Sequence, residues 1–115
     1  MDTKFIKQSE FLYVDLDGDF SMDSFEALLK RIGTEDDHKV IIDGSKLQKT
    51  DISYEIRYEL VIVAEKNLKE DVKYAVLWPS KDINSFTISN LIRLGITIQI
   101  FPKLAKAKKW LKITS

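Results

Sequence analysis

Hydrophobic and polar residues follow two different spacings along this chain, one typical of strands and the other of helices. Residues 11–17 alternate, which places Leu12, Val14 and Leu16 on one side of a half-buried strand. Short apolar or alternating runs predict the other strands, at residues 4–8, 40–42, 72–78 and 96–101. Apolar residues three and four positions apart predict four helices, over residues 24–32, 53–69, 83–94 and 102–111.

This succession of elements predicts the fold class. The order β-β-α-β-α-β-α-β-α indicates an α/β fold with four helices on a four- to five-stranded mixed, mostly parallel sheet. The two N-terminal strands can pair antiparallel, because only a short connection separates them. In such sheets, binding chemistry gathers where the parallel strands end.

Capping residues predict where the helices begin and end. Asp23, with an acid three residues later, fits an N-cap with a capping box, and Asp82 fits the N-cap of the third helix. Pro102 fits the first position of the last helix. Gly33 and Gly95 fit the left-handed position that ends a helix.

Composition narrows the classes of function. The 115 residues predict a single domain over residues 1–115, and 44% hydrophobic with 31% charged residues is ordinary for a water-soluble protein. A formal net charge of zero gives no support to a nucleic-acid partner. The absence of cysteine excludes disulfides and thiolate catalysis. No apolar run reaches the length of a signal peptide or of a membrane span, so a cytoplasmic protein is expected.

One polar segment stands between two apolar elements. It runs from Asp43, at the end of the third predicted strand, to Ser53, where the second helix begins. Either Asp51 or Ser53 can cap that helix, because a side-chain oxygen of either residue can accept a hydrogen bond from a free backbone N–H group.

The same segment resembles the STAS domain, and more closely the SpoIIAA-like (STAS/SEC14-like) small bacterial proteins. In that family a strand ends in Asp or Asn, and Asp-Ser-Ser-Gly then opens a helix. Here Asp43 ends the strand and Asp51 follows eight positions later, although Ile52 and Tyr54 replace the first serine and the glycine. The closing helix, Leu104–Leu111, is similar to the family's A-x-x-W-L pattern. The resemblance implies the SpoIIAA/STAS-like fold.

The resemblance also implies a role for Ser53, because it occupies the position that anti-sigma-factor antagonists phosphorylate. Three interpretations of Asp51 and Ser53 stay open: helix capping alone, phosphorylation of Ser53, and contact with another ligand or partner. A phosphate at a helix N-terminus is favoured by the helix dipole and the free N–H groups. Lys46, Lys49 and Arg57 lie close enough in sequence to balance its charge.

The second helix carries more apolar surface than one sheet face requires. Ile56, Leu60, Val63 and Ala64 form one stripe, and Tyr54, Tyr58, Val61 and Ile62 form another. The second stripe indicates burial under a neighbouring helix, a partner or homodimer surface, or a site for a small apolar ligand. We expect Asp43, Asp51, Tyr54, Arg57 and Tyr58 to form the interaction or ligand surface, with Arg57 paired to Asp43 or Asp51.

A calcium loop is the remaining candidate site. The acids at positions 1, 3, 5, 9 and 12 of such a loop are Asp15, Asp17, Asp19, Asp23 and Glu26. Position 6, which needs glycine, is Phe20, and a strand, not a helix, precedes the loop. The alternative is a row of outward-facing strand acids followed by a helix cap, and no metal site is predicted.

The sequence contains no phosphate-binding glycine loop, nucleophile elbow or Cys–His arrangement, so no cofactor or catalytic residue is predicted. We therefore expect a non-enzymatic regulatory or protein-interaction module that resembles anti-sigma-factor antagonists. Its surface would lie at the start of the second helix, and its partner would be another protein or a second copy of the chain. The alternative is a carrier or sensor of a small apolar or lipid-like ligand, and an enzyme is the third interpretation.

Overall fold

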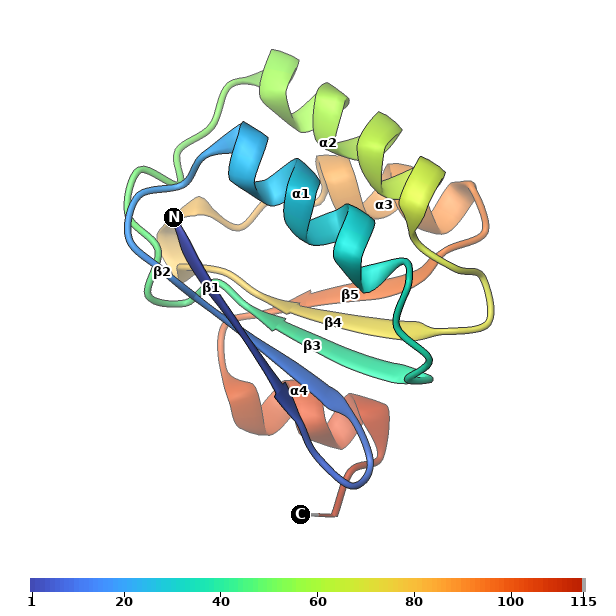
Figure 1. The fold of residues 1–115 in the computed structure, drawn as a ribbon. Coiled ribbons are helices and arrows are strands. Elements are labelled where there is room, and N and C mark those ends of the chain that lie inside the picture. The colour runs from blue at the N-terminus through green and yellow to red at the C-terminus, as the bar shows by residue number, and fades with distance from the viewer. Residues whose placement is uncertain (115) are drawn as a thin grey trace.

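The fold is a five-stranded mixed sheet with helices on both faces (Figure 1). The computed structural model describes residues 1–114. The strands are β1 (Asp2–Lys7), β2 (Leu12–Asp17), β3 (Lys39–Asp43), β4 (Lys73–Leu77) and β5 (Thr97–Phe101). The helices are α1 (Met22–Ile32), α2 (Tyr54–Asn67), α3 (Phe86–Arg93) and α4 (Leu104–Leu111), with a short 3-10 helix η1 at Ser80–Asp82.

The strands lie in the order β1-β2-β3-β4-β5, with β1 antiparallel to β2 and the other pairs parallel. The predicted α/β class, the mixed sheet and the order of elements are therefore confirmed. Helices α1, α2 and α3 cover one face of the sheet and α4 covers the other (Figure 1). No helix within residues 1–114 has both the length and the apolar character needed to cross a bilayer.

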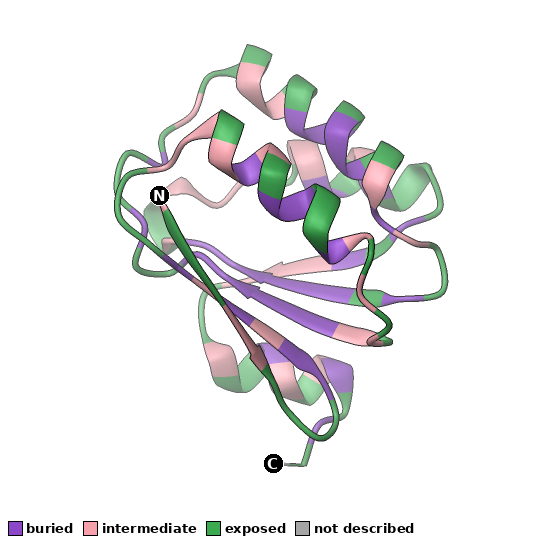
Figure 2. Cartoon of the chain, viewed as in Figure 1, coloured by how far each residue is buried: buried purple, intermediate pink, exposed green. Residues whose placement is uncertain are grey.

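The central strands are buried on both faces, as a continuous apolar run requires (Figure 2). Val40 and Ile42 belong to the core beneath α1, α2 and α3. Ile41 points the other way and packs in a smaller core with Ala107 and Leu111 of α4. Because side chains alternate along a strand, Asp43 lies on the same face as Ile41.

Two capping predictions for α1 are wrong. Ser21, not Asp23, is the N-cap, and its hydroxyl accepts a hydrogen bond from the Ser24 N–H group at 3.3 Å. Asp23 lies in the first turn instead, where a negative charge still favours the helix dipole. Gly33 is right-handed, with φ −61°. Its lack of a side chain serves close packing, since a Cβ atom would lie 2.4 Å from the carbonyl oxygen of Asn67.

The later helices also differ from their predicted starts. Asp82 lies in η1, and α3 starts at Phe86, whose N–H group donates to Asn84 Oδ1 at 3.1 Å. Pro102 precedes the N-cap of α4, Lys103, so the helix starts two residues later than predicted. Gly95 has φ +96° after α3, which confirms the predicted left-handed stop.

Candidate functional site

Ser53 is the N-cap of α2, as one of the two capping predictions proposed. Its hydroxyl oxygen accepts a hydrogen bond from the Ile56 N–H group at 3.2 Å, and the side chain is exposed. Asp51 is exposed two residues earlier and caps nothing. The loop before it is held by Thr50, which is 2% exposed and donates from Oγ1 to Asp82 Oδ2 at 2.6 Å. The start of α2 is therefore fixed against η1.

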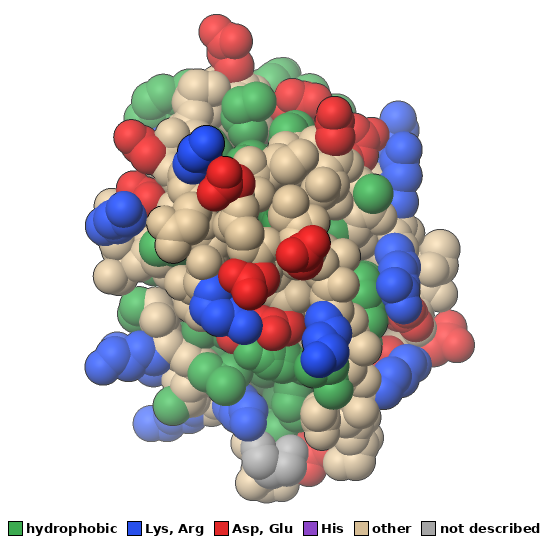
Figure 3. Space-filling model, turned by 60° about the vertical axis from the view of Figure 1, so that its left-hand side comes forward, with side chains coloured by type: hydrophobic (Ala, Val, Ile, Leu, Met, Phe, Trp, Pro, Cys, Tyr) green, Lys and Arg blue, Asp and Glu red, His purple; other side chains and the backbone are tan. Residues whose placement is uncertain are grey.

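Helix α2 buries most of its first apolar stripe and exposes most of the second. Leu60, Val63 and Ala64 of the first stripe are buried, and so is Val61 of the second. Tyr54, Tyr58 and Ile62, which we call the α2 stripe, remain 70%, 61% and 50% exposed. These positions recur every four residues, so the stripe runs along one side of the helix. Figure 3 shows hydrophobic side chains exposed at the top of the molecule, over α2, among acidic ones.

Two contacts hold the N-terminal end of the α2 stripe. The ring of Tyr54 packs edge-on against Phe86 of α3, with 5.7 Å between the ring centroids. The guanidinium of Arg57 lies 5.2 Å from the centroid of the same tyrosine ring. The prediction that Arg57 pairs with Asp43 or Asp51 is wrong, because within residues 1–114 it makes no ion pair. Arg57 instead lines a cavity together with residues of α3.

A half-open cavity of about 90 Å³ lies between the sheet, α2 and α3. Its walls are mostly apolar, and include Leu60 and Ala64 of α2, Ile88 and Leu91 of α3, and Trp78 after β4. The polar members of the lining are Arg57, Asp82, Asn84 and Thr87. All four are partly exposed, which places them at the rim of the cavity.

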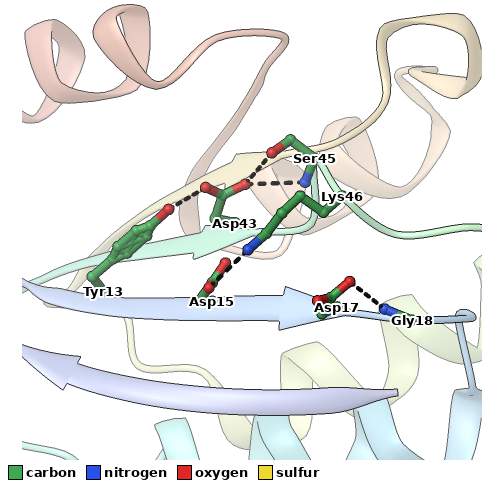
Figure 4. Close-up of polar contacts among 7 residues, drawn as sticks. All are labelled: Tyr13, Asp15, Asp17, Gly18, Asp43, Ser45 and Lys46. Atoms are coloured by element: carbon green, nitrogen blue, oxygen red, sulfur yellow. Dashed lines mark hydrogen bonds and ion pairs between the residues drawn. The ribbon is translucent and has the colours of Figure 1, made fainter.

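A separate polar cluster surrounds Asp43, which is 7% exposed at the end of β3 (Figure 4). Its Oδ2 accepts a hydrogen bond from the Tyr13 hydroxyl. Its Oδ1 accepts from the backbone N–H and the hydroxyl of Ser45, at 3.0 and 2.6 Å. Asp15, the register partner of Asp43 on β2, pairs with Lys46 Nζ at 3.0 Å. The cluster joins two strands to the first turn of the loop that leads to α2.

The surroundings of this cluster keep its two side-chain donors, Tyr13 and Lys46, protonated. Burial and the hydrogen bond to Asp43 raise the pKa of Tyr13 above its ordinary value. The hydrogen bond to Asp15 likewise raises the pKa of Lys46. At neutral pH the phenol therefore stays protonated and the amine stays charged, so neither side chain is available as a base.

The residues predicted to share one surface fall into two groups. Tyr54, Arg57 and Tyr58 lie together on α2, with Asp51 and Ser53 just before them. Asp43 lies on the opposite face of the sheet, where its acceptor atoms are already occupied. Tyr13 and Asp82 were not predicted as site residues. No local motif marks either residue, because each binds a partner about thirty positions away in the chain.

The acids of the calcium-like segment separate in the folded chain. Asp15 binds Lys46, Asp17 accepts from the Gly18 N–H group at 2.8 Å, and Asp19 pairs with Lys49 at 3.3 Å. In the described part of the chain, no three His, Cys, Asp or Glu side chains are grouped to hold a metal ion. The spacing along the sequence is thus not reproduced as a cluster of ligands.

A comparison with protein-family models found no match for this chain, and none was found among curated proteins. The site must therefore be interpreted from its own geometry.

Proposed function

We propose that this protein is a non-enzymatic interaction module that binds a protein partner through the α2 stripe. The observation that carries the proposal is the exposure of Tyr54, Tyr58 and Ile62 on one side of a single helix. Large apolar side chains grouped on a surface mark interaction sites, and tyrosine is enriched in such sites because its ring is apolar and its hydroxyl polar.

The resemblance to SpoIIAA-like STAS proteins supports the same surface. Ser53, at the position matching the phosphorylated serine of anti-sigma-factor antagonists, is exposed and immediately precedes the stripe. A phosphate on Ser53 would add about two negative charges beside Tyr54 and next to Asp51. Such a modification would oppose an apolar partner at this end of α2, and in this way the module would be regulated.

Site-specific photocrosslinking in the cells that make the protein tests this proposal. A photoreactive phenylalanine analogue replaces Tyr58 or Ile62 in two variants, and replaces Lys106, exposed on α4, in a matched control. We expect one product common to the Tyr58 and Ile62 positions and missing at Lys106. A product with twice the mass of the chain would identify the partner as a second copy. Equal crosslinking at all three positions, or none at the α2 stripe, would overturn the proposal.

A second candidate function, sensing or carrying a small ligand, is favoured by the cavity beneath α2 and α3. Its volume of about 90 Å³ falls below the ~300–1,000 Å³ of pockets that enclose drug-sized molecules. A long acyl chain does not fit that volume, so a lipid is a poor ligand. A small molecule with one short apolar group fits the cavity better.

A further inference from the structure

The cavity beneath α2 and α3 has two side chains of opposite charge at its rim. Neither side chain forms an ion pair with the other or with another residue among residues 1–114. Arg57 and Asp82 both line the cavity, yet no ion pair joins them. Within residues 1–114, the Arg57 guanidinium makes no hydrogen bond and only lies over the Tyr54 ring. Asp82 accepts one hydrogen bond at Oδ2, from Thr50, and its Oδ1 atom has no partner in the same residues.

Asp82 is held in place by a hydrogen bond, and Arg57 lies beside an aromatic ring. Thr50 is 2% exposed and binds Asp82 at 2.6 Å, which ties η1 to the loop before α2. Arg57 lies in the first turn of α2, with its guanidinium beside Tyr54. Asn84 and Thr87 also line the cavity and add an amide and a hydroxyl to its rim. The rim therefore offers hydrogen-bond donors for an anionic group and a carboxylate for a cationic one.

The interior of the cavity sets the size of the apolar part of a ligand. At about 90 Å³ the cavity is well below the ~300–1,000 Å³ of pockets that enclose drug-sized molecules, which favours a short aliphatic group. An apolar cavity lined by Leu60, Ile88 and Leu91 favours such a group over water, since it offers water no hydrogen-bond partner.

We propose that this cavity binds a free α-amino acid with a short aliphatic side chain, such as leucine, isoleucine or valine. The carboxylate lies against Arg57, the ammonium against Asp82, and the side chain enters the apolar interior. An α-amino acid carries both charges on one carbon atom, next to its apolar group, and so matches the opposite charges of the rim. This inference rests on the second candidate function and is independent of the α2 stripe.

Binding can be followed in the purified full chain through Trp78, which lines the cavity. A Trp110→Phe background removes the other tryptophan, so that the fluorescence reports Trp78 alone. The probes are L-leucine, 4-methylpentanoate, which lacks the ammonium, and 3-methylbutylamine, which lacks the carboxylate. We expect L-leucine to bind and each analogue to bind about tenfold or more weakly, because each loses one charge-assisted hydrogen bond.

Charge-removing variants assign the two ends of the ligand. Arg57→Gln should weaken the binding of L-leucine and of 4-methylpentanoate by about tenfold or more. It should leave the affinity for 3-methylbutylamine unchanged. Asp82→Asn should weaken the binding of L-leucine and of 3-methylbutylamine by a similar factor. It should leave the affinity for 4-methylpentanoate unchanged. Arg93→Gln is the matched control, since Arg93 lies on α3 outside the cavity lining. It should bind all three probes as the parent chain does.

Filling the cavity gives a test that changes no charge. Ala64→Leu adds three carbon atoms inside the lining and should abolish L-leucine binding, with thermal unfolding used to confirm that the variant is folded. Tyr58→Ser, outside the lining, should leave L-leucine binding intact even where it abolishes the crosslink at Ile62. The two functions can thus fail separately.

Several outcomes would overturn the inference. One is that L-leucine does not change the Trp78 fluorescence at millimolar concentration. Another is that 4-methylpentanoate binds as tightly as L-leucine and that Asp82→Asn changes the affinity for neither. The cavity would then bind a carboxylate alone. A third is that binding survives in a folded Ala64→Leu variant.

Discussion

The hydroxyl of Tyr13 on β2 donates a hydrogen bond to Asp43 at the end of β3, thirty residues later in the chain. Both residues lie on the α4 face of the sheet, and Asp43 is 7% exposed. Asp43 also accepts two hydrogen bonds from Ser45. This arrangement satisfies a buried carboxylate and at the same time fixes the loop that leads towards α2.

Replacing Tyr13 should therefore destabilise the fold. Tyr13→Phe removes one donor from the buried Asp43 carboxylate and should lower the free energy of unfolding by about 1–3 kcal/mol. Urea denaturation followed by circular dichroism measures the change. Tyr58→Phe is the matched control, because that side chain is 61% exposed, and should stay within about 0.5 kcal/mol of the parent chain. A loss of equal size in both variants would contradict the role assigned to Asp43.

Alkaline pH should weaken the same interaction. Burial and Asp43 raise the pKa of Tyr13 above the value of about 10 expected for the unfolded chain. The stabilisation is complete below about pH 10 and declines as pH rises further, since the unfolded chain then loses its proton first. Urea denaturation on either side of pH ~10 should show this decline. Burial also raises the pKa of Tyr74. Tyr13→Phe should therefore reduce the loss of stability with rising pH without removing it.

The cap of α2 can be separated from phosphorylation of the same residue. Ser53→Ala should cost about 1 kcal/mol of stability, because the Ile56 N–H group loses its acceptor. Ser53→Asp should retain most of the stability, since aspartate caps helices as well as serine does. Ser85 precedes α3 without a side-chain capping bond, so Ser85→Ala is the matched control and should change little. Thermal unfolding of the three variants would decide, and equal losses in Ser53→Ala and Ser85→Ala would refute the capping role.

For the Gly33→Ala substitution, close packing and backbone propensity predict stability changes of opposite sign. Its φ of −61° is open to any residue, so propensity alone predicts that Gly33→Ala stabilises the chain by about 0.4–1 kcal/mol. The added Cβ atom would lie 2.4 Å from the Asn67 carbonyl oxygen, so we expect a loss of about 1–3 kcal/mol. Lys30→Ala, in an exposed pair with Glu26, should change stability by less than about 0.5 kcal/mol. Urea denaturation measures both, and a more stable Gly33→Ala chain would contradict the close contact.

Local patterns predicted the elements well where the signal is repeated over many residues. The alternation of Leu12, Val14 and Leu16 and the apolar run at 40–42 both correspond to strands in the structure. The mostly parallel pairing agrees with the alternation of strands and helices along the chain. Helix starts were less certain, since a Ser or Asp can cap only if the backbone turns at that residue. Ser21 caps α1 in place of Asp23, and Asn84, not Asp82, accepts a hydrogen bond from the first N–H group of α3.

By itself, the sequence determined the order of strands and helices along the chain, because the spacing of apolar residues repeats within each element. The alternation of these elements indicated a mixed, mostly parallel sheet, but the sequence left the cap of α2 open between Asp51 and Ser53. Only the tertiary structure decided which apolar stripe of α2 faces solvent and that Asp43 lies on the opposite face from Arg57. It also decided that Arg57 and Asp82 line the same cavity. Those relationships arise from contacts between elements distant in the chain, and such contacts leave no periodic trace along it.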